Sequence, residues 1–188
     1  MAYYKSIGLI GRAQSGKDSV GARLRQRYGY QRVAFADPLK AAALRIDPLI
    51  PTSYGVQTRL ATLVNAVGWD YAKVTYPEVR RILQHVGQTV RDIDPGFWVR
   101  AAFPAIDAAE RLSLPVVVTD VRYENEARAL RDRGFSMVRV TRPGTLKPDA
   151  HKSETELDNW ATALTISNTG TLEDLNRIVD SLLLPRSR

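Results

Sequence analysis

Residues 11–18 read GRAQSGKD, and this stretch constrains the fold of the 188-residue chain more than any other. It follows the apolar run SIGLI at 6–10 and precedes a helix-like segment at 19–29. The spacing matches the phosphate-binding P-loop pattern G-x-x-x-x-G-K-[ST] at every position except the last, where Asp18 replaces the hydroxyl residue. Such a loop requires a buried strand before it and a helix after it, and the flanking segments predict both.

Two glycines and a lysine explain why this loop would bind phosphate. Gly11 and Gly16 allow the backbone to turn and to approach an anion without a Cβ in the way. Successive N–H groups then converge at the start of a helix, where the helix dipole also favours negative charge. We expect Lys17 to reach the β and γ phosphates. The alternative is a glycine-rich turn from strand to helix that binds no ligand.

Asp18 needs its own explanation, because phosphates repel a carboxylate unless a cation lies between them. With magnesium present, Asp18 becomes an oxygen ligand, either directly or through water. Ser19 points about 100° away around the helix and is the weaker candidate for that role. The alternative is that Asp18 is an acid of the first helical turn, stabilised by the helix dipole.

A second acidic position follows the most apolar run of the chain, PVVVT at 115–119. Asp120 is predicted at the carboxyl end of this strand, the edge at which α/β sheets bind ligands. An acid there is placed to hold magnesium or its water, and Arg122 is placed to contact an anionic substrate. The alternative is that Asp120 caps a helix that starts near Tyr123.

The remaining pattern predicts an α/β fold with a parallel sheet, because short apolar strands alternate with helix-length segments. The predicted strands are 6–10, 32–35, 115–119, 136–140 and 163–167. The predicted helices are 19–29, 37–46, 76–90, 97–112, 123–134 and 171–183. Asp37, Asp120 and Asn168 fall near strand ends and are therefore expected at one edge of the sheet.

We expect one domain over residues 1–188, with a core of about 1–37 and 113–188. Residues 38–112 show no clear strand and predict a helical insert that binds the substrate. The segment at about 141–156 contains Pro, Gly and Lys and predicts a lid, with Arg139 and Arg142 available to a transferring phosphoryl group. An ordinary surface loop is the alternative there.

Composition narrows the functional classes. The chain has 27 Lys and Arg against 20 Asp and Glu, a net charge of +7, and no run of five or six basic residues. Nucleotide phosphates account for this charge better than a stable nucleic-acid partner. The absence of Cys excludes disulfides, thiol catalysis and Cys-based zinc sites. Neither a signal peptide nor a membrane-spanning run is recognisable, so a cytoplasmic location is expected.

Six segments together resemble one family. GRAQSGKD, FADPLK, RRILQHVGQTVRDIDPGFWVR, TDVRYENEA, HKSE and SNTGTLEDL are similar, in order, to motifs of the bacteriophage deoxynucleoside monophosphate kinases, members of the P-loop nucleoside monophosphate kinase superfamily. The resemblance implies a three-layer P-loop NTPase sandwich with a five-stranded parallel sheet, a helical substrate-binding insert and a lid. It also implies ATP as donor, Mg²⁺, a phage source and hence the cytoplasm of an infected cell.

Residue roles follow from this resemblance, position by position. Catalytic roles fall to Lys17, Asp18, Arg122 and Arg142, and metal binding to Asp18 and Asp120. Donor contacts fall to Gly11, Arg12, Ala13, Gln14, Ser15, Gly16, Lys17, Asp18, Ser19, Asn168 and Gly170, the last two near the adenine. Acceptor contacts fall to Asp37, Lys40, Gln84, Arg91, Trp98, Arg122 and Glu154. Trp98 is alternatively a core residue, and the roles of His151 and Glu154 stay open.

The predicted reaction is ATP-dependent phosphorylation of deoxynucleoside monophosphates to diphosphates, which would supply precursors for phage DNA. Rival interpretations are a dephospho-coenzyme A or ribonucleotide kinase, a nucleic-acid-dependent NTPase, and a nucleotide-binding regulator without transferase activity. The expected partners are small nucleotides, with neither a membrane nor a stable nucleic acid, and a homodimer is left open.

Overall fold

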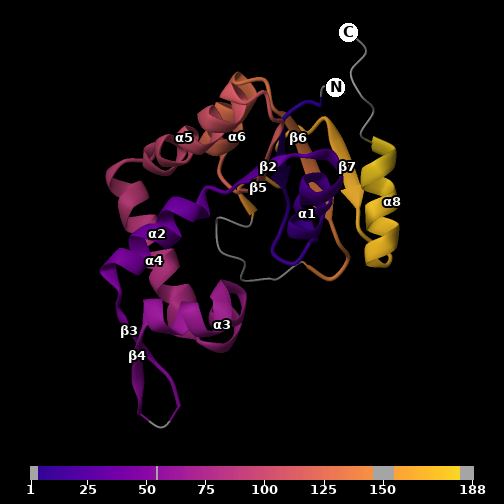
Figure 1. Ribbon diagram of the computed structural model, residues 1–188. Coiled ribbons are helices and arrows are strands. Elements are labelled where there is room, and N and C mark those ends of the chain that lie inside the picture. Colours follow the sequence, from indigo (N-terminus) through magenta and orange to yellow (C-terminus); the bar gives the residue numbers. More distant parts are fainter. Residues whose placement is uncertain (1–3, 54, 146–154, 183–188) are drawn as a thin grey trace. The chain divides into compact units, whose positions relative to one another are not determined.

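The computed structural model describes residues 4–53, 55–145 and 155–182 (Figure 1). Its contacts divide the chain into two compact units. We call them the sheet unit, Met1–Phe35 with Ala102–Arg188, and the helical unit, Ala36–Ala101. Each unit is described by itself. The residues predicted as a lid lie partly outside the described range, at 146–154.

The sheet unit is built on five parallel strands, as predicted. They are β1 (Ile7–Ile10), β2 (Gln31–Val33), β5 (Val116–Val121), β6 (Ser136–Thr141) and β7 (Leu164–Ser167). Their order is β2-β5-β1-β6-β7, so β1 is central and pairs with β5 on one side and β6 on the other. The loop at 11–16 therefore emerges from the middle of the sheet.

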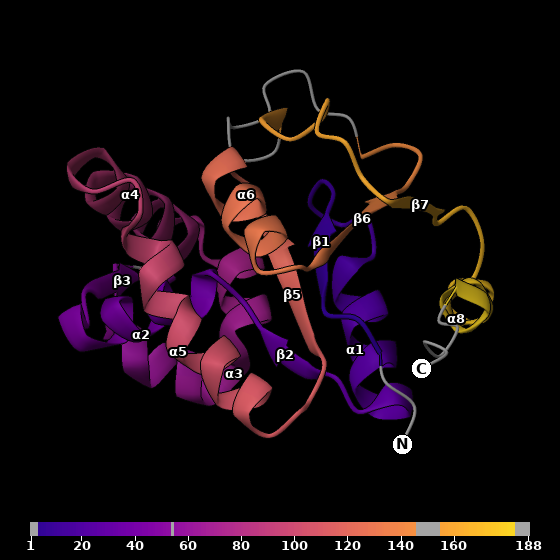
Figure 2. The ribbon, with the colours of Figure 1, turned by 90° about the horizontal axis from the view of Figure 1, so that it is seen from above.

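Helices cover both faces of this sheet, which gives three layers (Figure 2). On one face, α1 (Lys17–Tyr28) and α8 (Leu172–Leu182) pack Leu24 and Val179 against Leu9 of β1. On the other face lies α6 (Glu124–Asp132), whose Leu130 reaches the Cα side of Gly8. A Cβ at Gly8 would meet Leu130 at 3.1 Å and Met137 at 2.7 Å, so glycine permits this close packing.

The helical unit contains three helices and the start of a fourth. They are α2 (Ala36–Ile46), α3 (Leu60–Thr75), α4 (Pro77–Ile93) and α5 (Phe97–Arg111), the last of which continues into the sheet unit. A separate core of mostly aliphatic residues holds this unit together, including Ile50, Leu60 and Val79, each fully buried. The unit therefore has its own hydrophobic interior.

The helical unit also contains a β-hairpin, so the prediction of no strand between 38 and 112 is wrong. Strands β3 (Leu49–Pro51) and β4 (Gln57–Arg59) pair antiparallel. Each strand has only three residues, and β3 includes Pro51. The alternation of apolar and polar residues is therefore too short to predict a strand. Asp47 fixes the base of the hairpin, because its carboxylate accepts the N–H of Ala61 at 2.8 Å.

Helix α3 was not among the predicted helices, and a glycine explains why its pattern is hard to read. Gly68 has φ 77° and ψ 161°, so α3 is two helical segments joined by a kink. The kink interrupts the 3.6-residue periodicity on which helix prediction depends.

Within the described residues, no helix is both long and apolar enough to span a bilayer.

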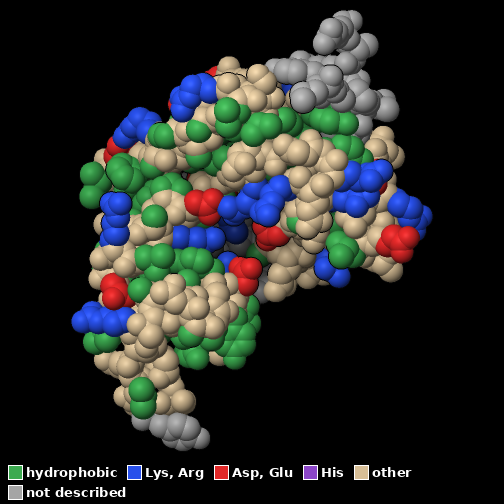
Figure 3. All heavy atoms as spheres, viewed as in Figure 1, with side chains coloured by type: hydrophobic (Ala, Val, Ile, Leu, Met, Phe, Trp, Pro, Cys, Tyr) green, Lys and Arg blue, Asp and Glu red, His purple; other side chains and the backbone are tan. Residues whose placement is uncertain are grey.

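Charged side chains on the pictured face lie in several separate groups, many of them with both signs (Figure 3). Arg81 pairs with Glu78 at 2.5 Å on α4, and Arg100 pairs with Asp94 in the same unit. Exposed pairs of this kind contribute at most about 1 kcal/mol each. In these two pairs each arginine charge is balanced by a neighbouring carboxylate.

Candidate nucleotide-binding site

The loop between β1 and α1 has the strand-loop-helix arrangement that its motif predicts. Gly11, Gln14 and Gly16 have φ values of 152°, 63° and 105°, which turn the backbone sharply into α1. A Cβ at Gly11 would lie 2.3 Å from the carbonyl oxygen of Val140, so no other residue fits there. The loop ends at the N-terminus of a 12-residue helix, where unpaired N–H groups and the dipole favour an anion.

Lys17 folds back over this loop. Its side chain is buried, and Nζ donates hydrogen bonds to the carbonyl oxygens of Gly11 at 2.5 Å and Arg12 at 2.7 Å. The ammonium is therefore held beside the loop backbone, with neutral acceptors that phosphate oxygens could replace. Asp18 is exposed in the first turn of α1, and Ser19 is half-buried.

Asp120 lies near the end of β5, next to the strand that carries the loop. The register pairs Val121 with Ile10, so both strands end at the same edge of the sheet. Oδ1 of Asp120 accepts the N–H of Phe35 at 2.8 Å, which ties the segment after β2 to β5. The Asp120 carboxylate thus belongs to the carboxyl edge from which the loop emerges.

Glu126 is a site-proximal residue that the sequence interpretation missed. It is 2% exposed, and its Oε2 accepts the N–H groups of Arg122 at 2.8 Å and Tyr123 at 3.2 Å. This bond caps α6 and fixes the backbone that carries Arg122. Glu126 therefore has the capping role that was considered above for Asp120. The sequence signal for this role is a Glu three residues after the N-cap residue, Tyr123.

The sequence predicts Asn168 and Gly170 near the donor adenine. In the structure, both residues take part in contacts within the protein. Asn168 is buried, and its Nδ2 donates to the carbonyl oxygen of Ser15 at 3.0 Å. Gly170 allows Asp174 to approach the start of α8, where its Oδ2 accepts the N–H of Thr171 at 2.9 Å. The Asn168 amide thus contacts the loop, and the adenine contact of this segment, which the sequence assigned to its backbone groups, stays a prediction.

A short segment, Thr155–Trp160, contacts the loop and the neighbouring elements. Asp158 pairs with Arg12 at 2.5 Å, and Glu156 accepts the N–H of Glu124 at the start of α6 at 2.9 Å. Arg139 donates to the carbonyl oxygens of Leu157 at 2.8 Å and Trp160 at 2.7 Å. Arg139 is thus occupied in holding this segment, which corrects the expectation that it is available to a phosphoryl group.

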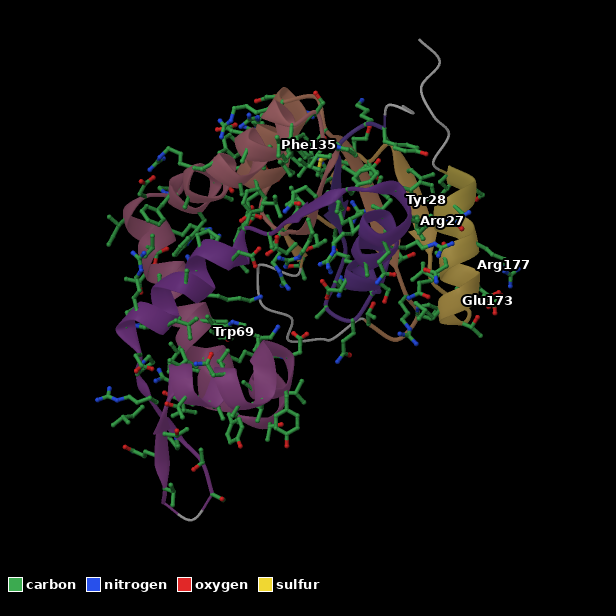
Figure 4. All side chains as sticks on the ribbon, in the orientation of Figure 1. Arg27, Tyr28, Trp69, Phe135, Glu173 and Arg177 are labelled. Atoms are coloured by element: carbon green, nitrogen blue, oxygen red, sulfur yellow. The ribbon has the colours of Figure 1, made fainter. Side chains whose placement is uncertain are left out.

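The helical unit holds most of the residues predicted for the acceptor, but not Arg122 or Glu154. Asp37 and Lys40 form an ion pair at 3.8 Å in the first turns of α2, and Lys40 Nζ lies 5.9 Å from the ring centre of Trp69. Figure 4 shows Trp69 on α3. Arg91 is half-buried and donates to the carbonyl oxygen of Gly87 at 3.3 Å, while Gln84 is exposed. Trp69 is a half-buried aromatic side chain beside a predicted acceptor residue, and the sequence interpretation did not select it.

Trp98 does not have the exposure that a base-stacking residue needs. It is 3% exposed, its indole N–H donates to the carbonyl oxygen of Gly87 at 3.0 Å, and its ring packs edge-on against Phe97. The structure therefore supports the core alternative for Trp98. Arg142 is exposed at the end of β6, and Glu154 and His151 lie outside the described residues.

Comparison with known proteins decides the family. The family model described as deoxynucleotide monophosphate kinase matches residues 72–179, more than half of the chain. A putative deoxynucleotide monophosphate kinase of Acanthamoeba polyphaga mimivirus is 32% identical over 168 residues, which cover 80% of this chain and 81% of that protein. The chain belongs to the deoxynucleotide monophosphate kinase family.

The family includes phage proteins. The deoxynucleotide monophosphate kinase of Enterobacteria phage T4 is 32% identical over 102 residues, 52% of this chain and 42% of the phage protein. The range matched by the family model contains Asp120, Arg122 and Asn168 but not the loop at 11–18. The loop's assignment therefore rests on its own motif and geometry.

Solved structures of other kinases show a distant likeness in fold. Dephospho-CoA kinase from Campylobacter jejuni has a TM-score of 0.48 at 10% identity and covers 96% of both chains. Shikimate kinase from Aquifex aeolicus has a TM-score of 0.44 at 15% identity, covering 94% of this chain and 95% of that one. The fold assignment of this family member rests on its own five-stranded sheet.

Proposed function

We propose that this chain transfers the γ-phosphoryl group of ATP to a deoxynucleoside monophosphate, yielding ADP and a deoxynucleoside diphosphate. The observation that carries the proposal is the loop of residues 11–18 with Lys17 folded against it, in a chain of the deoxynucleotide monophosphate kinase family. The phage and mimivirus relatives support a role in supplying DNA precursors in an infected cell. A homodimer stays a prediction.

The donor would be held by its phosphates. Backbone N–H groups of the loop at the start of α1 would surround the β and γ phosphates. Lys17 would exchange the carbonyl oxygens of Gly11 and Arg12 for phosphate oxygens, which are stronger acceptors because they are charged.

Two carboxylates suit a magnesium ion at this site. Among the described residues no cluster of three or more His, Cys, Asp and Glu is placed to hold a metal. Mg²⁺ does not need such a cluster, because it usually binds through one or two carboxylates, waters and substrate phosphates. Asp18 and Asp120 would supply these carboxylates. The bound ion would reduce the negative charge on the phosphates during transfer.

The transfer requires little covalent chemistry from the protein. An oxygen of the acceptor phosphate forms a bond to the γ-phosphorus while the bond from that phosphorus to the β–γ bridging oxygen breaks, and ADP leaves with the electron pair. The acceptor phosphate is anionic at neutral pH, so no side chain needs to act as a base. Lys17, Arg122 and Arg142 would offset the charge that accumulates on the transferring group.

The acceptor would bind through residues of the helical unit. Arg91 would pair with the monophosphate, because guanidinium groups match phosphate geometry. Asp37, Lys40 and Gln84 would contact sugar and base, and Glu154, outside the described residues, stays a prediction. Trp98 is omitted because it is buried.

A coupled assay of ADP formation with a panel of deoxynucleoside and ribonucleoside monophosphates tests the proposal, with dephospho-coenzyme A as an additional acceptor. We expect turnover with at least one deoxynucleoside monophosphate and none with dephospho-coenzyme A. Turnover that requires DNA and falls steeply with salt would instead indicate a nucleic-acid-dependent NTPase. ATP binding without transfer to any acceptor would indicate a regulator.

A further inference from the structure

Asn168 is fixed by the sheet and aimed at the phosphate-binding loop. It directly follows β7, and its backbone N–H donates to the carbonyl oxygen of Thr141 at 2.7 Å, extending the parallel pairing with β6 by one step. Its side chain is 7% exposed. The end of β7 thus fixes the side-chain amide of Asn168 next to the loop of residues 11–18.

This amide contacts the loop at one peptide unit. Nδ2 donates to the carbonyl oxygen of Ser15 at 3.0 Å, across 153 residues of sequence. A Cβ at Gly16 would lie 2.5 Å from the same Nδ2, so the approach requires glycine at position 16. The Nδ2 group of Asn168 therefore lies against the Ser15–Gly16 peptide.

The geometry of that peptide unit has a consequence for anion binding. In a planar trans peptide the C=O and the N–H point in opposite directions. When Asn168 holds the Ser15 carbonyl, the Gly16 N–H is turned away from Asn168. We infer that Asn168 is a positioning residue that aims the Gly16 N–H, and with it the start of α1, at the donor phosphates. This inference rests on the proposed function.

Two substitutions test the hydrogen bond together: Asn168→Asp removes the donor but adds a negative charge near the phosphates, and Asn168→Ala removes the donor alone. Asn168→Asp keeps the size and shape of the side chain, but an ionised carboxylate accepts and cannot donate to the Ser15 carbonyl. When protonated, the same side chain donates again. Burial beside a carbonyl oxygen raises the pKa of such a carboxyl, so lowering the pH restores the donor at moderately acidic pH. Asn176→Asp, on α8, is the matched control because it adds the same charge at a residue for which the described contacts include no hydrogen bond to the loop.

The measurements are ADP affinity by calorimetry and the KM values for ATP and for the acceptor. At about pH 8 we expect Asn168→Asp to weaken ADP binding and raise the KM for ATP about tenfold, and to leave the acceptor KM within about twofold. At about pH 5.5 most of the ADP affinity should return. Wild-type protein and Asn176→Asp should show neither change.

Three results would overturn the inference. They are wild-type ADP affinity in folded Asn168→Asp at about pH 8, an equal loss for both substrates, and a loss that does not recover on acidification. Asn168→Ala decides between loss of the donor and added charge, also where the aspartate variant does not fold, because it removes the donor without adding charge, and unchanged ADP affinity there overturns the inference. A wild-type protein that binds ADP but phosphorylates no acceptor would contradict the proposed function alone.

Discussion

The ammonium of Lys17 lies 2.5 Å from the carbonyl oxygen of Gly11, so the first glycine and the lysine of the loop are joined by a hydrogen bond. Both residues are part of the same phosphate-binding motif. The loop backbone therefore accepts hydrogen bonds from the lysine of its own motif.

Replacing Lys17 by Ala removes the positive charge from the loop. We expect kcat to fall by about 10²–10³-fold, since charge on the transferring group is no longer offset. Far-ultraviolet circular dichroism should be unchanged, because Lys17 supports the loop and not the core. Lys73→Ala is the control, as Lys73 pairs only with exposed Asp70 among the described contacts. Full activity of Lys17→Ala would rule out the P-loop assignment.

Asp18→Ala tests whether this carboxylate serves the metal. If it does, the magnesium concentration for half-maximal activity should rise about tenfold or more, as on loss of a metal-supporting group. Glu173→Ala is a matched control, because Glu173 is also an exposed acid in a first helical turn, that of α8 (Figure 4). A magnesium titration that is the same for Asp18→Ala and wild type would make Asp18 only an acid that favours the helix start.

Asp180 links α8 to α1 and makes stability depend on pH. Its carboxylate accepts two hydrogen bonds from Arg23, at 2.9 and 2.5 Å, and one from Tyr28 at 2.9 Å. Figure 4 shows Arg27 and Tyr28 beside α8. These partners, Arg23 first, lower the pKa of Asp180 to about 2.

Because the folded pKa is below the unfolded value of about 3.9, the ionised pair stabilises the fold above about pH 4. That contribution is lost as pH falls toward about 2. Asp180→Asn should therefore lower the melting temperature at neutral pH and converge with wild type at the acidic end. Asp132→Asn, at an exposed acid of α6, should show no such pH dependence. A constant difference at all pH values would contradict this account.

Trp98→Phe separates the core role from a role in base recognition. The substitution removes the indole donor to the Gly87 carbonyl, which keeps its hydrogen bond from Arg91, and should lower the free energy of unfolding by about 0.5–1.5 kcal/mol. Denaturant titration measures this, and the acceptor KM of the folded variant should not change. A higher KM with unchanged stability would instead show that Trp98 contacts the base.

Sequence patterns predicted the sheet unit well because its strands are apolar and its loop has a specific motif. They failed where the structure depends on a contact between residues far apart in the sequence, or on an element too short to show periodicity. The hydrogen bond from Asn168 to Ser15 depends on strand register, which a local pattern does not contain. The hairpin at 49–59 is too short for periodicity. Trp98 illustrates a third limit, because the pattern of a predicted binding segment does not show whether an aromatic side chain is buried or exposed.

The central position of β1 has a consequence for biosynthesis. The loop follows β1, whose neighbours in the sheet are β5 and β6. The Ser15 carbonyl of the loop accepts a hydrogen bond from Asn168. Because β5, β6 and Asn168 all follow the loop in the sequence, a chain leaving the ribosome exposes the loop before the elements that surround it. Because such long-range pairing is slow, nucleotide affinity should arise only after most of the chain has been synthesised, and added nucleotide should assist the final stage of folding rather than the first.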